Sequence, residues 1–190
     1  MGLNPNHCIF GIWIAVGIVW LFAAMGQKRA ARSEAAATRI LHMALMIVAF
    51  GLLFSPRLSI GVLAWRVVPD APAVEWVGLA LTLAGCGIAV WARLLLGGNW
   101  SASVTVKEDH RLIRRGPYTV VRHPIYSGFL LGLLGTALAL GQLRGFVGLV
   151  LAFVGWRMKS RIEEAFMIEQ FGAEYRQYER EVKALIPFVL

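Results

Sequence analysis

The sequence predicts an all-α integral membrane protein with about five transmembrane helices, and three observations lead to this fold class. Hydrophobic residues make up 58% of the 190 residues. Charged residues make up 16%, against about 25% in an ordinary globular protein. The mean hydropathy is +0.64. A soluble domain of this size buries too small a fraction of its surface to hide so much apolar area, so a soluble globular fold is excluded.

Five apolar stretches are the candidate spans. About 20 apolar residues, each rising 1.5 Å, cross a hydrocarbon core of about 30 Å. The second stretch is interrupted by Pro56 and Arg57, and a less hydrophobic segment up to Val68 either extends the span or lies along the interface. The last two stretches are joined by a tight turn at 141–144, so they form an antiparallel hairpin. The stretches are 8–25, 40–54, 74–96, 124–140 and 145–158.

The basic residues orient these spans. All but three of the 19 Lys and Arg residues lie on one side, and the other three are Arg57, Arg66 and Arg144. By the positive-inside rule the first side is cytoplasmic, which puts the N-terminus outside and the C-terminus inside. The net charge of +8 therefore reflects orientation and not nucleic-acid binding. The Ala- and Gly-rich composition indicates a prokaryote, so the expected location is the prokaryotic cytoplasmic membrane.

The chain divides into residues 1–96, with three spans, and residues 97–190. The second part contains a polar cytoplasmic loop, the helical hairpin and a cytoplasmic or interfacial C-terminal helix. Loops longer than about 12–15 residues are usually functional or disordered, and this one contains too many aromatic and aliphatic residues for disorder. Because the loop and the C-terminal segment attach to the same end of the hairpin, a site is expected where they meet. The three segments are 97–123, 124–158 and 159–190.

Two motifs in the loop are candidates for this site. Gly116-Pro117 marks a turn that aims Tyr118, although an interfacial aromatic anchor has the same pattern. A residue before proline avoids the helical conformation, and Pro124 suits the first turn of a helix. His123 is therefore expected at or just outside the start of the fourth span, where free backbone N–H groups can bind an anion. The alternative is a cap or a lipid-headgroup contact.

A third candidate is the acidic pair Glu163-Glu164. Acidic residues so close to a lipid-facing helix are uncommon and are usually paired or functional. Lys159 lies one turn before Glu163, so a helical ion pair is the simplest alternative. Further on, the apolar residues of 166–178 share one helical face, and Gly172 indicates that the helix stops and restarts. No His, Cys, Asp and Glu residues have metal-ligand spacing, so no metal is predicted.

Five segments of the C-terminal half form a series, covering about residues 97–187. In this order and spacing they resemble the isoprenylcysteine carboxyl methyltransferase family, part of a wider group that includes phospholipid N-methyltransferases. The first three spans carry little beyond hydropathy. The segments are Gly98-Asn99-Trp100-Ser101, His110-Arg111-Leu112-Ile113-Arg114-Arg115-Gly116-Pro117-Tyr118, Arg122-His123-Pro124-Ile125-Tyr126-Ser127-Gly128, Glu163-Glu164 and Phe171-Gly172-Ala173-Glu174-Tyr175.

The resemblance implies a methyltransferase that uses S-adenosyl-L-methionine in a cytoplasmic pocket of a helical membrane fold. The family places an arginine four residues before the matching glutamate, and here Lys159 stands in its place, next to Arg157 and Arg161. The implied catalytic residues are Lys159, Arg157 and Glu163. Carried over by position, the implied cofactor contacts are His110, Arg111, Leu112, Ile113, Tyr118, His123, Pro124, Ile125, Tyr126, Glu163 and Glu164.

Within this resemblance, each part of the cofactor has a matching group. His123 and the start of the fourth span suit its carboxylate, and Glu163 suits its amine or a ribose hydroxyl. The adenine would contact Leu112, Ile113 and Tyr118. The acceptor would be a lipophilic small molecule or a lipid-linked substrate that enters from the bilayer.

Three activities remain open from the sequence. The expected one is carboxyl O-methylation of a prenylcysteine-type substrate, whose ionised carboxylate needs no strong base. N-methylation of a phospholipid or lipophilic amine would require Glu163 or His123 as a base. A non-enzymatic membrane transport or assembly protein is the third, although transporters usually show internal repeats and intramembrane charges, and here the charges gather at the cytoplasmic face. Membrane lipids are expected partners, and nucleic acid is not.

Overall fold

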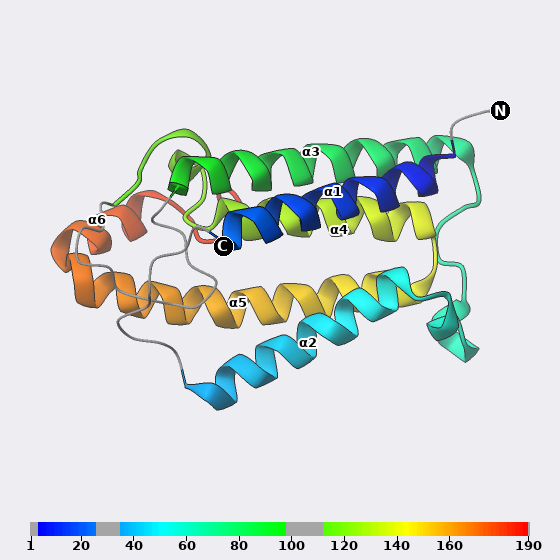
Figure 1. Cartoon of the computed structure of the whole chain (residues 1–190), viewed down its shortest axis with the longest axis horizontal. Coiled ribbons are helices and arrows are strands. Elements are labelled where there is room, and N and C mark those ends of the chain that lie inside the picture. The colour runs from blue at the N-terminus through cyan, green and yellow to red at the C-terminus, as the bar shows by residue number, and fades with distance from the viewer. Residues whose placement is uncertain (1–3, 26–34, 98–111, 190) are drawn as a thin grey trace.

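The computed structural model describes residues 4–25, 35–97 and 112–189. Five long helices run roughly parallel or antiparallel to one another and coincide with the five predicted spans (Figure 1). A sixth, short helix follows the fifth. The fold class is therefore confirmed as an all-α integral membrane protein. The helices are α1 (Pro5–Met25), α2 (Ala36–Phe54), α3 (Pro72–Leu96), α4 (Pro124–Leu140), α5 (Leu143–Phe171) and α6 (Ala173–Glu181).

Length and composition distinguish the spans. Helices α1, α2 and α3 each contain an apolar segment long enough to cross a bilayer. Helix α4 is apolar but has only 17 residues. Helix α5 has 29 residues and continues without a break past residue 158, where the sequence predicted the span to end. The second half of α5 is therefore a polar helical arm that extends from the membrane and carries both predicted glutamates.

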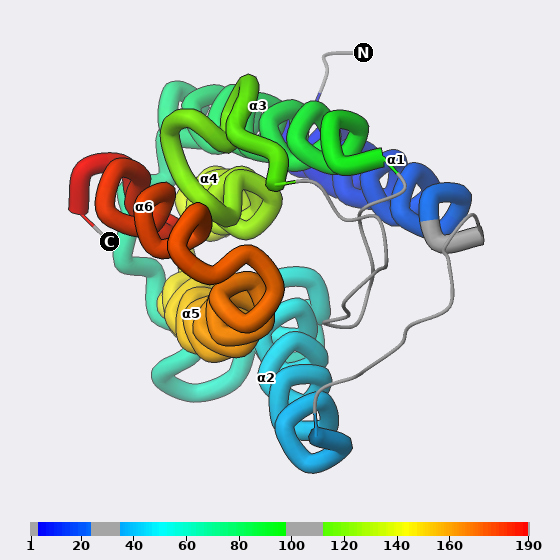
Figure 2. The backbone as a smooth tube through the Cα atoms, turned by 90° about the vertical axis from the view of Figure 1, so that its left-hand side faces the viewer, coloured from blue at the N-terminus to red at the C-terminus, as the bar shows by residue number. Residues whose placement is uncertain are grey.

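Helix α4 lies between α3 and α5 (Figure 2). The contact with α3 is the more extensive because small residues let the two backbones approach closely. A Cβ atom added to Gly128 would lie 2.6 Å from the carbonyl oxygen of Gly85. The hydroxyl of Thr82 donates to the carbonyls of Gly78 and Gly132, at 2.9 and 3.1 Å, and so satisfies a polar group inside the membrane.

The end of the bundle opposite the polar arm is closed by a compact turn. Gly141 has φ +69°, a left-handed conformation that favours glycine, and it reverses the chain between α4 and α5. Arg144 is buried there and donates to the carbonyls of Leu52 and Ser55 at the end of α2, at 2.7 and 3.0 Å. The segment after α2 forms two short 3-10 turns, Pro56–Leu58 and Gly61–Ala64, so it does not extend the α2 helix.

The predicted stop and restart of the C-terminal helix is confirmed. Helix α5 ends at Phe171, and Gly172, with φ +54°, allows the chain to turn before α6 begins. Two tyrosines of α6 are buried, and the Tyr178 hydroxyl donates to the carbonyl of Tyr118 at 2.5 Å. Helix α6 therefore packs against the loop before α4, and the chain then returns as an extended segment toward the start of α4.

Candidate functional site

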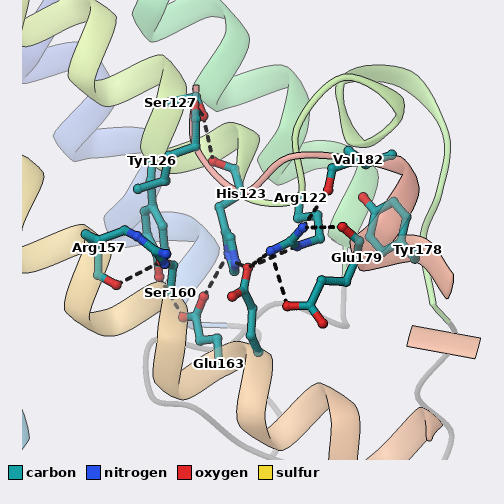
Figure 3. Close-up of polar contacts among 12 residues, drawn as sticks. Arg122, His123, Tyr126, Ser127, Arg157, Ser160, Glu163, Tyr178, Glu179 and Val182 are labelled. Atoms are coloured by element: carbon teal, nitrogen blue, oxygen red, sulfur yellow. Dashed lines mark hydrogen bonds and ion pairs between the residues drawn. The ribbon is translucent and has the colours of Figure 1, made fainter. Parts of the chain in front are cut away.

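The start of α4, the polar arm of α5 and the C-terminal segment bring charged side chains together at one end of the helix bundle (Figure 3). His123 is the residue before the first turn of α4, as Pro124 predicted. Glu163 and Glu164 come from α5, one helical turn beyond the predicted end of the span. The helical hairpin therefore places residues about 40 positions apart in the sequence within hydrogen-bonding distance.

His123 lies between the two glutamates. Its Nδ1 is 3.3 Å from Oε2 of Glu163, and its Nε2 is 3.1 Å from Oε1 of Glu164. The side chains of His123 and Glu164 are almost fully buried, whereas that of Glu163 retains 24% exposure. With both ring nitrogens protonated, the imidazolium donates to one carboxylate on each side. Glu163 is therefore the most exposed side chain of this trio.

These contacts shift the pKa values in opposite directions. Burial alone disfavours the charged imidazolium, but the hydrogen bonds and charges of Glu163 and Glu164 raise the pKa of His123 above its ordinary value. Burial likewise opposes the carboxylates, yet the contact with His123 lowers the pKa of Glu163 and that of Glu164. The trio therefore keeps two negative charges around one positive charge near neutral pH.

The same shifts make stability depend on pH. The His123 contribution is fully present below the ordinary value of 6.5 and is lost as pH rises through the raised folded-state pKa. The Glu163 and Glu164 contributions are present above 4.5 and are lost as pH falls through the lowered values. We expect the melting temperature in detergent to be highest between these two values and to fall on both sides.

The His123→Gln variant tests the alkaline part of this profile. It is expected to lose the fall in melting temperature above pH 6.5, because glutamine carries no titrating proton. His7→Gln, a change at an exposed position near the N-terminus, serves as the control and keeps the full profile. An alkaline fall that persists unchanged in His123→Gln contradicts the assignment.

Arg122 anchors the trio to the C-terminal segment. Its Nε and Nη2 donate to Oε1 of Glu164, at 3.0 and 2.6 Å. Its Nη1 donates to the carbonyls of Glu179 and Val182, at 3.1 and 2.5 Å. The side chain is 7% exposed, so its fork of donors is fully used inside the protein. The sequence analysis did not select Arg122, although it immediately precedes His123.

The C-terminal strap, residues 182–187, covers the start of α4. The backbone N–H groups of Arg122 and His123 donate to the carbonyls of Lys183 and Ala184, at 2.8 and 3.0 Å. The Ser127 hydroxyl donates to the carbonyl of Leu185 at 2.5 Å. The sequence predicted that His123 and this helix start would bind a carboxylate of a ligand. The strap accepts from the backbone N–H groups of Arg122 and His123, and the two glutamates contact the His123 ring, so the pairing with a ligand carboxylate stays a prediction.

Tyr126 links the charged trio to an aromatic row. Its hydroxyl donates to Oε1 of Glu163 at 2.6 Å. Its ring stacks on Trp156 of α5, with centroids 6.0 Å apart, and Trp156 stacks in turn on Phe129. Phe129 contacts Trp13 of α1. The charged groups therefore adjoin an aromatic row that continues into the core of the helix bundle.

The remaining predicted cofactor contacts of the described residues lie in or beside an apolar cluster. Tyr118 is buried there, its hydroxyl donates to the carbonyl of Ala92 on α3 at 3.3 Å, and Tyr126, which bonds to Glu163, packs against the same cluster. Ile125 packs in the same apolar cluster, with Ile113 at its edge. Leu112 is half-buried and Pro124 is buried. Two further predicted contacts, His110 and Arg111, lie outside the described residues.

The predicted cationic residues lie one turn before the glutamates on α5. The charge of Lys159 contributes to the lowered pKa of Glu163, and Arg157 Nη1 lies 3.5 Å from the hydroxyl of Ser160. A residue that the sequence analysis missed is His42 of α2, whose Nδ1 is 3.2 Å from the carbonyl of Gly155. The sequence could have indicated His42, because ionisable residues are rare inside apolar spans.

Comparison with known proteins identifies the family. The sequence profile described as "Phospholipid methyltransferase" matches residues 74–174, just over half of the chain. The chain therefore belongs to the phospholipid methyltransferase family. The matched region contains α3, α4 and the arm of α5, and so includes the charged trio.

Individual relatives agree with the resemblance seen in the sequence. A probable protein-S-isoprenylcysteine O-methyltransferase of Oryza sativa subsp. indica is 33% identical over 121 residues, which are 61% of this chain and 62% of the relative. The protein-S-isoprenylcysteine O-methyltransferase of Schizosaccharomyces pombe is 38% identical over 104 residues, which are 52% of this chain and 43% of the relative. The matches span less than two-thirds of the length of these relatives.

A solved structure shares the fold. The eukaryotic intramembrane Ras methyltransferase ICMT (isoprenylcysteine carboxyl methyltransferase) superposes with a TM-score of 0.60. The superposition covers all of this chain and 70% of that structure, at 23% sequence identity. The helical membrane architecture is therefore shared.

Proposed function

We propose that this protein is an integral membrane methyltransferase that uses S-adenosyl-L-methionine to methylate the carboxylate of a lipophilic, prenylcysteine-type acceptor. The observation that carries the proposal is the buried His123–Glu163–Glu164 trio, which adjoins an aromatic surface leading into the membrane. The family of the chain and the names of its relatives support the same activity. We further propose that the site faces the cytoplasm of a prokaryotic cell, on the side that carries most of the basic residues.

The chemistry of the trio fits the cationic parts of S-adenosyl-L-methionine. Two carboxylates share one imidazolium and one guanidinium, and Glu163 keeps an exposed edge that suits an ammonium group. The rings of His123, Tyr126 and Trp156 stack in one row, with centroids 5.7 and 6.0 Å apart, so a sulfonium bound near Glu163 would lie beside aromatic rings. When bound, this cofactor supplies an electrophilic methyl group. His123 holds Glu163 in position, and Glu164 in turn is held by Arg122.

Lys159 and Arg157 are proposed to orient the acceptor. On the α5 arm, Lys159 lies one turn and Arg157 nearly two turns before Glu163. A carboxylate acceptor is already ionised near neutral pH, so the chain has no proton to remove. The negative charge of the carboxylate and the positive charge of the sulfonium are both lost as the new C–O bond forms. A site with aromatic walls and little water therefore favours the reaction, because water stabilises the charged reactants more than the neutral products.

N-methylation of a phospholipid or lipophilic amine is the second candidate. The matching family profile bears the name of phospholipid methyltransferases. An ammonium acceptor must lose a proton before it reacts, and Glu163 is the exposed base in the trio. Lys159 in place of the family arginine also lacks the bidentate fork that favours carboxylates. Turnover of a farnesylcysteine analogue, compared with that of phosphatidylethanolamine, separates the two activities.

Binding of S-adenosyl-L-methionine by calorimetry tests the proposal. We expect the Glu163→Gln variant to bind about tenfold more weakly than the parent, because a hydrogen bond to a charged group is lost. Glu174→Gln, a change at an exposed position on α6, is the matched control and retains parental affinity.

Lys159→Met separates cofactor binding from acceptor recognition. This variant should bind S-adenosyl-L-methionine like the parent and lose turnover of a carboxylate acceptor. A folded parent that shows no binding overturns the proposal and favours the non-enzymatic transport or assembly protein.

A further inference from the structure

A cavity lies on the face of α4 opposite Tyr126. It is a groove of about 790 Å³ between α3, α4 and α5, and the C-terminal strap closes one side of it with Leu185, Ile186 and Pro187. Its walls include Trp91 of α3, Leu131 of α4 and Phe153 of α5. Tyr126 and its aromatic row are absent from the lining, so the groove is separate from the proposed reaction site.

The depth of the groove matches one leaflet of a bilayer. On α4 its lining runs from Pro124, at the cytoplasmic end of the helix, to Leu134. Ten helical residues rise about 15 Å, which is half of a hydrocarbon core of about 30 Å. The lining contains no charged side chain, and Ser127, its hydroxyl residue, is already bonded to the strap. A hydrocarbon chain from the cytoplasmic leaflet therefore suits both its length and its polarity.

Two cationic residues adjoin lining residues at the cytoplasmic end of the groove. Arg115 immediately precedes Gly116, a lining residue, and Lys183 forms a backbone bridge with Val121, another lining residue. Both side chains are exposed, and neither has an ion-pair or hydrogen-bond partner in the part of the chain that the structure describes. The neighbouring Arg114, in contrast, is paired with Glu181. Unpaired cations above an apolar groove suit a phosphate above its acyl chain.

From this arrangement we infer that the groove is a phospholipid site, with one acyl chain between α3, α4 and α5 and the phosphate beside Arg115 and Lys183. The bound lipid belongs to the cytoplasmic leaflet. It prefers an anionic headgroup, because no carboxylate among the described residues pairs with Arg115 or Lys183. The inference is independent of the proposed methyl transfer, since the groove and the charged trio lie on opposite faces of α4.

Photo-crosslinking in lipid nanodiscs tests this site. The probe is a phosphatidylglycerol with a diazirine in the middle of one acyl chain, diluted in phosphatidylcholine, and mass spectrometry maps the labelled residues. We expect labelling to concentrate on the lining of the groove, above that of the exposed apolar face of α2, which includes Ile40 and Ile47. Equal labelling of the two surfaces overturns the inference.

Two sets of variants make the test specific. Val150→Trp fills the groove from α5 and should reduce its labelling to the level of α2, whereas Val48→Trp, an exposed valine on α2, should leave it unchanged. The double variant Arg115→Gln, Lys183→Gln should weaken phosphatidylglycerol retention about fivefold per charge removed, with Arg176→Gln, Arg180→Gln as the exposed control. Retention that is equal in both double variants overturns the headgroup assignment.

Competition for the crosslinking probe shows whether the groove binds a phospholipid or the proposed methyl acceptor. Excess unlabelled phosphatidylglycerol should displace the probe from the groove, and a farnesylcysteine analogue should not. Displacement by the farnesyl compound alone would assign the groove to the acceptor and overturn the phospholipid inference. Calorimetry of S-adenosyl-L-methionine on the Val150→Trp variant is expected to match the parent, so failure of the lipid site and failure of the proposed activity give different results.

Discussion

Replacing Arg122 with methionine is expected to destabilise the protein by about 3–5 kcal/mol and to abolish binding of S-adenosyl-L-methionine. The guanidinium is 7% exposed and donates to a carboxylate that is itself 10% exposed. Its removal leaves Glu164 buried with one cation fewer and leaves the carbonyls of Glu179 and Val182 without this donor. The strap and the trio are expected to loosen together, because Arg122 bonds to both. Chemical unfolding in detergent measures the first effect and calorimetry the second.

Two further variants make this result interpretable. Arg114→Met removes an arginine eight positions away whose ion pair with Glu181 is partly exposed, so its cost should be about 0–1 kcal/mol. Arg122→Lys keeps the charge but loses the fork of donors, and should recover part of the stability and part of the affinity. If Arg122→Met unfolds no more readily than Arg114→Met, the buried arginine does not anchor the strap.

The sequence predicted the elements of the site better than their contacts. Hydropathy located the five long helices because a bilayer imposes both length and composition on a span. Pro124 located the start of α4, and therefore His123, because proline restricts the residue before it and suits the first helical turn. The short turn at Gly141 required a hairpin, so the polar ends of α4 and α5 had to meet. These predictions rest on local rules or on the membrane itself.

The contacts that depend on tertiary packing were missed or misassigned. The strap is extended, and an extended segment of six residues carries no periodicity that names its partner. Arg122 was overlooked because a surface arginine and a buried one look alike in sequence. The position of Tyr118 after a turn did not reveal that its hydroxyl bonds to the carbonyl of Ala92 on α3, and its contact with a cofactor stays a prediction. The span in α5 was predicted to end at residue 158, with a separate helix after it, but one helix continues to Phe171, because charge ends an apolar span without ending the helix.

The close approach of α3 and α4 leads to the second large effect. Replacing glycine with alanine is expected to change the stability of the protein in opposite directions at two positions of α3. Alanine raises helix stability by up to about 1 kcal/mol relative to glycine at an interior position. At Gly87 an added Cβ would meet nothing within 4 Å, so Gly87→Ala should be neutral or stabilising. At Gly85 the added Cβ would overlap the backbone of Gly128 and Gly132 on α4.

Gly85→Ala is therefore expected to destabilise the protein by about 1–3 kcal/mol, in spite of the gain in helix propensity, because two helix backbones must separate. The backbone of α4 cannot move aside as a flexible side chain does, and its displacement shifts the start of α4 that carries His123. Cofactor affinity should fall with stability in Gly85→Ala and remain parental in Gly87→Ala. Unfolding in detergent and calorimetry on both variants measure this, and equal behaviour of the two glycines would mean that α3 and α4 are not in backbone contact at Gly85.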